Sequence, residues 1–275
     1  MTRRTLRNGR RCTRAATRLF ASAGLVTLLG TARADPQRPY PPLLDTEARH
    51  APPTVRQQHW ALATNALLTE SNRGRHDVLG GNKRTPAQIA EWREVLRRSW
   101  RIENRDDLLR TLEWLRAGGH RREFDETAAL LARLTPNQID QLREHLADNP
   151  QALNRIEIVF RHRGELGDKS IAAWDFARYI SICGFAWIAG YIEEDEAWRL
   201  IMPVARMLQR TFDSWEDLGR NHLIGREFWS LSATQRRGHE FRQSFRTLLD
   251  DARSPWRTLP WDLDLAPPEE AAPPD

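Results

Sequence analysis

The stretch IAAWDFARYISICGFAWIA, residues 171–189, decides the fold of this chain. Its large apolar side chains, from Phe176 to Trp187, are spread around every side of a helical wheel, and a helix of that kind is surrounded by other helices. Gly184 lets a neighbouring element approach closely, and Gly190 is a typical helix stop. We therefore predict a buried central helix over 171–189.

Two further helices are predicted directly after it. Glu193 to Glu196 place four acidic residues at the start of the first, where the helix dipole favours negative charge. Consecutive side chains on a helix point in different directions, so these carboxylates do not converge on a metal ion. Pro203 is expected to kink this helix, and Ser214 opens the next one, which runs to Trp229.

The rest of the chain carries many helix signals and almost no strand signals. Two similar helix starts place Thr at the N-cap, Pro at the first helical position and Gln at the third; they are Thr85-Pro86-Ala87-Gln88 and Thr135-Pro136-Asn137-Gln138. The remaining patterns predict helices over 55–70, from Asn104 to Gly118, from Pro150 to Gly164 and from a Ser232 cap to Asp250, with an extended piece over 256–265. The predicted fold class is all-α, a single multi-helix globular domain with a buried central helix.

Composition divides the chain into four parts. Residues 1–34 hold eight Arg and no acidic residue, then an apolar run, then a small-residue site ending at Ala34; this order is typical of a secretory signal peptide cut before Asp35. Residues 35–54 contain six Pro and are expected to form a linker. Residues 55–265 form the helical domain, and 266–275 (APPEEAAPPD) a disordered tail.

This organisation predicts a periplasmic or secreted protein, with a cytoplasmic location as the alternative. Both the general secretory and the twin-arginine export routes stay open. The apolar run is too short to span a bilayer, so no membrane span is expected in the mature chain. The net charge of +5 belongs to the leader, because 34 basic side chains face 37 acidic ones without it. That balance argues against a nucleic-acid partner.

Three segments resemble the bacterial family of unknown function DUF1266. They are AWDFARYISICGFAWIAGYIEEDEAW (173–198), FDSWEDLGRNHLIGREFW (212–229) and, for the family's N-terminal helices, LRRSWRIENRDDLLRTLEWLRAGGH (96–120). The resemblance covers about residues 60–229. It implies a mostly helical fold, and it implies no established biochemical activity.

Asp175 and Arg178 are the polar residues that least suit the central helix. They lie three residues apart and share a face, and Arg178 can stack on Trp174. One interpretation is a buried ion pair that fixes how the helix packs; removing one partner of such a pair costs about 3–5 kcal/mol. The other is the floor of a pocket, where Asp175 acts as a base or metal ligand and Arg178 holds an anion.

His222 and Arg226 lie four residues apart on the third helix of the central segment. If that helix packs against the central one, both can converge with Asp175 and Arg178, and these four are the candidate catalytic residues. A structural role for each is the alternative. Most of the eleven tryptophans are expected in the core, including Trp174, Trp187, Trp198, Trp215 and Trp229.

The usual catalytic, metal-binding and nucleotide-binding signatures are missing from the sequence. No cofactor and no metal site is therefore predicted. Cys183, the one cysteine after the leader, lies in an apolar context and is expected to be a buried thiol.

We expect an exported helical binding or interaction module that recognises a protein partner. The alternative is an uncharacterised, hydrolase-like enzyme with a cleft around Asp175, Arg178, His222 and Arg226.

Overall fold

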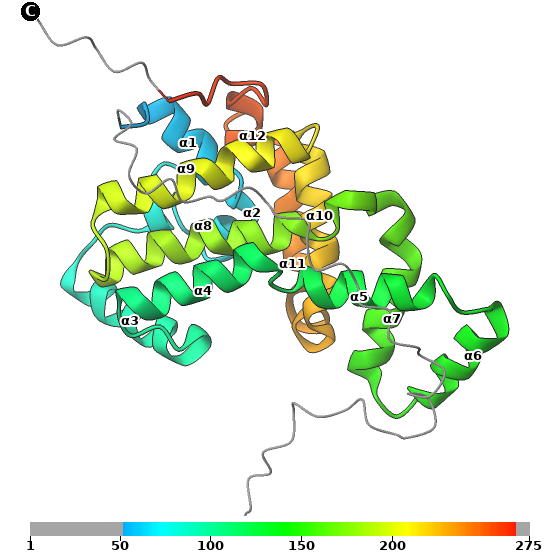
Figure 1. The fold of residues 1–275 in the computed structure, drawn as a ribbon. Helices are drawn as coiled ribbons and strands as arrows, with labels where there is room; N and C mark the ends of the chain where they lie inside the picture. Colours follow the sequence, from blue (N-terminus) through cyan, green and yellow to red (C-terminus); the bar gives the residue numbers. More distant parts are fainter. Residues whose placement is uncertain (1–51, 268–275) are drawn as a thin grey trace, which may run out of the picture. The chain divides into compact units, whose positions relative to one another are not determined.

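The computed structural model describes residues 52–267, and every regular element in that range is helical (Figure 1). The predicted all-α class is confirmed. The predicted signal peptide, most of the linker and most of the C-terminal tail lie outside the described residues. In chain order the elements are α1 (Val55–Ala63), α2 (Ala66–Ser71), the 3₁₀ turn η1 (Leu79–Gly81), α3 (Pro86–Trp100), α4 (Arg105–Ala117), α5 (Arg121–Leu131), α6 (Pro136–His145), α7 (Pro150–Leu166), the 3₁₀ turn η2 (Gly167–Lys169), α8 (Ala172–Ala189), α9 (Glu194–Thr211), α10 (Trp215–Trp229), α11 (Leu231–Asp250) and α12 (Pro255–Thr258).

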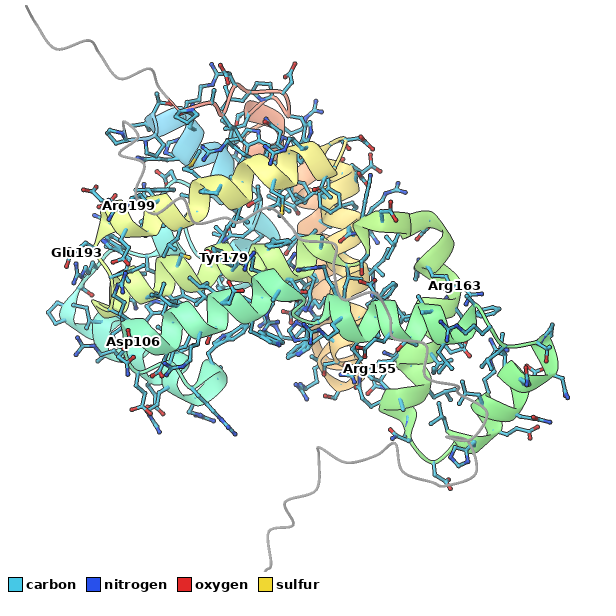
Figure 2. All side chains as sticks on the ribbon, in the orientation of Figure 1. Asp106, Arg155, Arg163, Tyr179, Glu193 and Arg199 are labelled. Carbon is cyan, nitrogen blue, oxygen red and sulfur yellow. The ribbon has the colours of Figure 1, made fainter. Side chains whose placement is uncertain are left out.

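Helix α8 is the buried centre that its sequence predicts. It packs against α3, α4, α9, α10 and η1, and Figure 2 shows Tyr179 midway along it, with side chains of neighbouring helices on both sides. Gly190 ends the helix in the left-handed conformation, with φ of 79°. Gly184 lies against η1, where a Cβ would stand 2.6 Å from the backbone nitrogen of Gly80. Backbone therefore touches backbone at this point.

The local capping chemistry positions most helix starts as predicted. The side chains of Thr85, Asn104, Thr135 and Ser214 each accept a backbone N–H at the start of α3, α4, α6 and α10. Helix α9 begins after Glu193 and contains Pro203.

Four predicted boundaries are wrong. Helix α7 continues through Gly164 to Leu166, because an added Cβ at Gly164 would meet nothing and the glycine has no backbone reason to stop the helix. Helix α11 is capped by Ser230 rather than Ser232. The helix predicted over 55–70 breaks at Thr64 and Asn65, where the side-chain amide of Asn65 donates to Ser181. Residues 255–258, at the start of the predicted extended piece, form helix α12.

Two apolar clusters form the core. The larger surrounds α8 and draws on α1, α3, α4 and α9. The smaller joins α5, α6 and α7 to one end of α8 and α10, where Phe124 and Phe228 meet edge to face with centroids 5.3 Å apart. Trp174 belongs to this second cluster and contacts Trp229. The α8–α10 crossing is close, since a Cβ on Gly225 would lie 2.3 Å from Cβ of Trp174.

The last described segment, residues 259–266, is bound mainly through its own carbonyl groups, and we call it the C-terminal strap. Gln57 of α1 donates to the carbonyls of Asp264 and Ala266, and Gln209 of α9 donates to those of Trp261 and Leu263. The indole of Trp60 donates to Pro260 in the same way. The strap therefore ties together α1 and α9, which lie far apart in the sequence (Figure 1).

Over residues 52–267, no helix combines the length and the apolar content needed to cross a bilayer.

Candidate functional site

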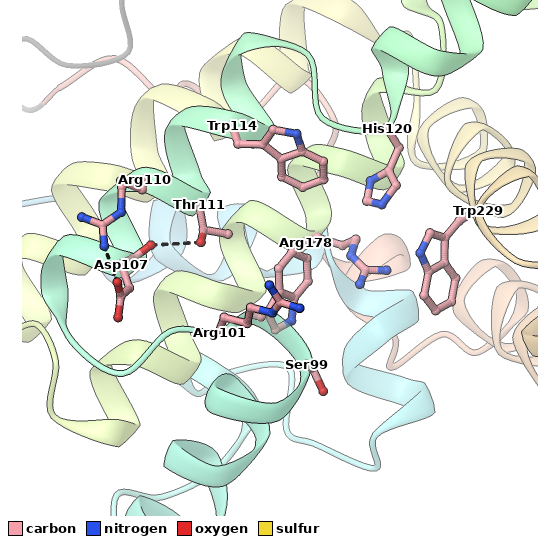
Figure 3. A pocket seen from close by; sticks show the side chains of 10 residues that line it. Ser99, Arg101, Asp107, Arg110, Thr111, Trp114, His120, Arg178 and Trp229 are labelled. Atoms are coloured by element: carbon pink, nitrogen blue, oxygen red, sulfur yellow. Dashed lines mark hydrogen bonds and ion pairs between the residues drawn. The ribbon is translucent and has the colours of Figure 1, made fainter. Parts of the chain in front are cut away.

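A pocket of about 480 Å³ opens where the ends of several helices meet (Figure 3). Its volume falls within the range of small-molecule sites, which is about 300–1,000 Å³. It is lined by the end of α3, one face of α4, the turn before α5, the middle of α8 and the last residue of α10. The lining residues are Ser99, Trp100, Arg101, Asp107, Arg110, Thr111, Trp114, His120, Arg178 and Trp229.

Arg178 of α8 enters this pocket between indole rings. Its guanidinium carbon lies 4.3 Å from the ring centroid of Trp174, 4.6 Å from that of Trp100 and 4.9 Å from that of Trp229. Its Nε is buried without a hydrogen-bond partner, and among residues 52–267 no carboxylate forms an ion pair with it. Burial is the main reason that the pKa of Arg178 falls to about 10. The aromatic faces offset part of the cost of burying this charge.

Asp175 pairs with the turn before α5, rather than with Arg178. Its carboxylate is fully buried and accepts the backbone N–H groups of His120 and Arg121 at 3.2 and 3.0 Å. It also accepts from Nδ1 of His120 at 2.7 Å and from the guanidinium of Arg121 at 3.0 Å. This carboxylate thus caps the N-terminus of α5 from another helix, where the dipole favours negative charge. The expected Asp175–Arg178 ion pair is replaced by an Asp175–Arg121 pair.

Gly119 is what allows the turn to come so close to this carboxylate. Its φ is 52°, and an added Cβ would lie 2.5 Å from Oδ2 of Asp175. A side chain at this position would be strained by the backbone conformation and would also collide with the carboxylate. The Gly118-Gly119 pair, expected only to end a helix, therefore also builds the contact between α8 and α5.

His222 and Arg226 lie close to Trp174 but do not line the pocket. His222 is fully buried, its ring 5.3 Å from that of Trp174, and neither ring nitrogen has a hydrogen-bond partner among the described residues. Burial, followed by the charges of Arg178 and Arg226, lowers its pKa to about 3. Arg226 donates to Thr234 and to the carbonyl of Ala233, and its guanidinium lies 4.0 Å from the ring of Phe241. Of the four candidates, Arg178 alone reaches the pocket.

The tryptophans divide between the core and the pocket. Trp174, Trp198 and Trp215 are buried, whereas Trp187 and Trp229 are partly buried. Trp100 and Trp114 join Trp229 in the pocket wall, and Trp114 is 46% exposed. Cys183 is fully buried, which raises the pKa of its thiol.

Sequence reasoning missed His120, Arg121 and Arg101. Arg101 is the residue after α3 and holds a left-handed conformation with φ of 57°, which costs a residue with a side chain about 1 kcal/mol. In return, its side chain lines the pocket. The one carboxylate in the lining, Asp107, already pairs with Arg110. Two guanidinium groups in this pocket therefore have no carboxylate of their own within residues 52–267.

Across residues 52–267, His, Cys, Asp and Glu side chains nowhere gather in a group of three or more suited to a metal ion.

Comparison with known proteins identifies a family whose model matches a segment that contains every lining residue of this pocket. The family model described as "Protein of unknown function (DUF1266)" matches residues 95–261, more than half of the chain. The protein belongs to this family. The match begins later than the resemblance predicted from the sequence and extends beyond Trp229, through α11 and α12.

Two curated relatives from Escherichia coli K12 are similar to the chain. The uncharacterised protein YbeR is 25% identical over 132 residues, which cover 48% of this chain and 55% of YbeR. The inner membrane protein YnjI is 29% identical over 150 residues, which cover 54% of this chain and 42% of YnjI. The chain thus spans about half the length of the curated relatives it matches. No solved structure matches it.

Proposed function

We propose that this protein binds a small anionic ligand with an apolar or aromatic body in the pocket around Arg178. The observation that carries the proposal is the guanidinium of Arg178, which is held between three indole rings and pairs with no carboxylate in residues 52–267. A planar guanidinium is suited to phosphate and carboxylate groups. The rings of Trp100, Trp114 and Trp229 offer apolar surface to the rest of the ligand.

Titration calorimetry with phenyl phosphate as the probe tests this proposal. Arg178→Met keeps the aliphatic stem and removes the charge, so the affinity should fall at least tenfold, as loss of a charge-assisted hydrogen bond implies. The unfolding temperature should stay the same or rise, because a buried charge without a partner is removed. Binding unchanged in Arg178→Met, or no binding to the wild type, contradicts the proposal.

Arg143→Met is the matched control. Arg143 also stacks on an aromatic ring, that of Phe160, at 4.9 Å, but it pairs with Glu157 and Asp140 and lies outside the pocket. Its replacement should leave phenyl phosphate binding unchanged. Arg101→Gly is an independent test. It should weaken phenyl phosphate binding, because a guanidinium is removed from the pocket. It should also raise the free energy of unfolding by about 1 kcal/mol, because glycine adopts the left-handed conformation without strain.

We also propose that the chain is exported and cut after Ala34, on the order of charged, apolar and small residues in its first 34 positions. N-terminal sequencing of the protein recovered from a periplasmic fraction tests this. Asp35 as the first residue supports export, and an intact Met1 in the cytosol contradicts it.

A further inference from the structure

The turn between α4 and α5 places an imidazole on the wall of the anion pocket. His120 lines the pocket, and Figure 3 shows its ring lying between Trp114 and Trp229. Its side chain is 17% exposed. Two indoles lie edge to face with the imidazole ring, with centroids 5.1 Å away for Trp114 and 6.3 Å away for Trp174. This histidine is thus fixed in orientation by its neighbours.

Asp175 determines which ring nitrogen of His120 is left for a ligand. The carboxylate is a hydrogen-bond acceptor, so Nδ1 of the imidazole, 2.7 Å away, is the donor. In the neutral ring the lone pair then lies on Nε2. Within residues 52–267, no hydrogen bond engages Nε2. A histidine that lines a pocket, with a buried carboxylate on one ring nitrogen and no hydrogen bond on the other, has the arrangement of a general base.

We propose that His120 is the general base of a phosphate-ester hydrolase whose substrate binds in this pocket. The inference rests on the proposed anion binding. Phosphate is favoured over an uncharged ester because Arg178 and Arg101 line the same pocket without carboxylate partners, and two cations match a dianionic group. The aromatic walls accommodate the alcohol portion of the ester.

Water is the second reactant, and it attacks the phosphorus of the ester. Nε2 of His120 takes a proton from water while the water oxygen forms a bond to phosphorus. The bond from phosphorus to the ester oxygen breaks on the opposite side of phosphorus, and the leaving oxygen takes a proton from solvent, to which Nε2 of His120 then releases its own. The products are an alcohol and inorganic phosphate. The two guanidinium groups stabilise the charge on the non-bridging oxygens, and Asp175 is a positioning residue that holds the imidazole.

Hydrolysis of para-nitrophenyl phosphate by the full chain, followed by the colour of released nitrophenolate, tests the inference. The wild type should hydrolyse para-nitrophenyl phosphate. The kcat of His120→Gln should be lower by about a hundredfold or more, as expected for loss of a general base. Its affinity for phenyl phosphate should stay within a few-fold, because Arg178 is intact. In His120→Ala, added imidazole should restore part of the rate, which a purely structural role would not produce.

His162→Gln is the matched control. His162 also bonds a carboxylate through Nδ1, that of Glu165, and its side chain is 18% exposed, but it lies outside the pocket. It should keep the full rate. Phenyl phosphate binding without turnover by the wild type overturns the catalytic inference and leaves the binding proposal standing. Equal turnover in wild type and His120→Gln also overturns the catalytic inference. A wild type that binds no phenyl phosphate overturns both.

Discussion

At the residue scale, the buried imidazole of His222 should make stability depend on pH. Its pKa is about 3 in the folded protein, against an ordinary value of 6.5 that the unfolded chain retains. Well above pH 6.5 the His222 imidazole is neutral in both states, so it does not lower the free energy of unfolding. As the pH falls from 6.5 towards 3, the unfolded state takes up a proton that the folded state refuses. The free energy of unfolding should therefore drop by up to about 1.4 kcal/mol per pH unit.

Chemical denaturation of wild type and His222→Leu between about pH 7 and pH 4 measures this effect. The variant should show a shallower loss of stability with falling pH. At neutral pH it should be at least as stable as the wild type, because two unsatisfied buried nitrogens are removed. The control His239→Leu, at an exposed position on α11, should keep the wild-type slope. Parallel curves for wild type and His222→Leu would show that His222 has no such role.

The sequence alone indicates which residues of the pocket are unusual, but not what they contact. Asp175 and Arg178 are conspicuous because they are charged positions on an apolar helix. The partner of Asp175, however, lies 55 residues earlier. Which donor reaches a buried carboxylate depends on how the α4–α5 turn docks, and no local pattern in Gly118-Gly119-His120 encodes that docking. His120 could be found only once the helices were placed.

At the element scale, the contact between α8 and η1 should tolerate no side chain at Gly184. An added Cβ would lie 2.6 and 2.7 Å from backbone atoms of Gly80, which cannot move as a flexible side chain would. Gly184→Ala should therefore lower the free energy of unfolding by about 1–3 kcal/mol. This loss would occur although alanine is the better helix former.

Gly164→Ala on α7 is the control for helix propensity. Its added Cβ meets nothing within 4 Å, so the same substitution should stabilise the protein by up to about 1 kcal/mol. Urea denaturation measures whether the free energy of unfolding falls in Gly184→Ala and rises in Gly164→Ala. Equal effects at the two positions would mean that the α8–η1 contact is not as close as described.

Helix starts were predictable where one side chain does the capping. Thr85, Asn104 and Thr135 each accept the backbone N–H three residues ahead, so their role can be read locally. The start of α11 was missed because Ser230 ends α10 and caps the next helix at once. The break after α1 coincides with a hydrogen bond from the side chain of Asn65 to Ser181, 116 residues away, and no local pattern shows such a contact.

At the scale of the whole molecule, the segment matched by the family model does not contain the whole core. Residues 95–261 leave out α1, α2 and η1, and with them the buried side chains of Trp60, Leu67 and Leu79. Trp60 lies 4.8 Å from Trp215 and 5.2 Å from Trp261, ring to ring. Removal of Trp60 would expose both partners to water.

A chain trimmed to residues 95–261 should therefore unfold at a much lower temperature than residues 52–267, or show no cooperative transition. Loss of several large buried side chains costs about 2–5 kcal/mol each, against a total stability of about 5–15 kcal/mol. Near-ultraviolet circular dichroism during heating measures the transition. Equal melting of the two chains would contradict the role given to α1 and the strap.

Trp114 gives the protein an optical reporter of its own. Its indole is 46% exposed at the edge of the pocket, whereas Trp60, Trp174, Trp198 and Trp215 are enclosed. An indole in contact with water fluoresces at longer wavelength than one surrounded by apolar side chains. The red edge of the emission spectrum therefore reports on Trp114, together with partly exposed indoles outside the pocket such as Trp187 and Trp261. A molecule that enters and covers Trp114 shifts that emission towards the blue without any added dye.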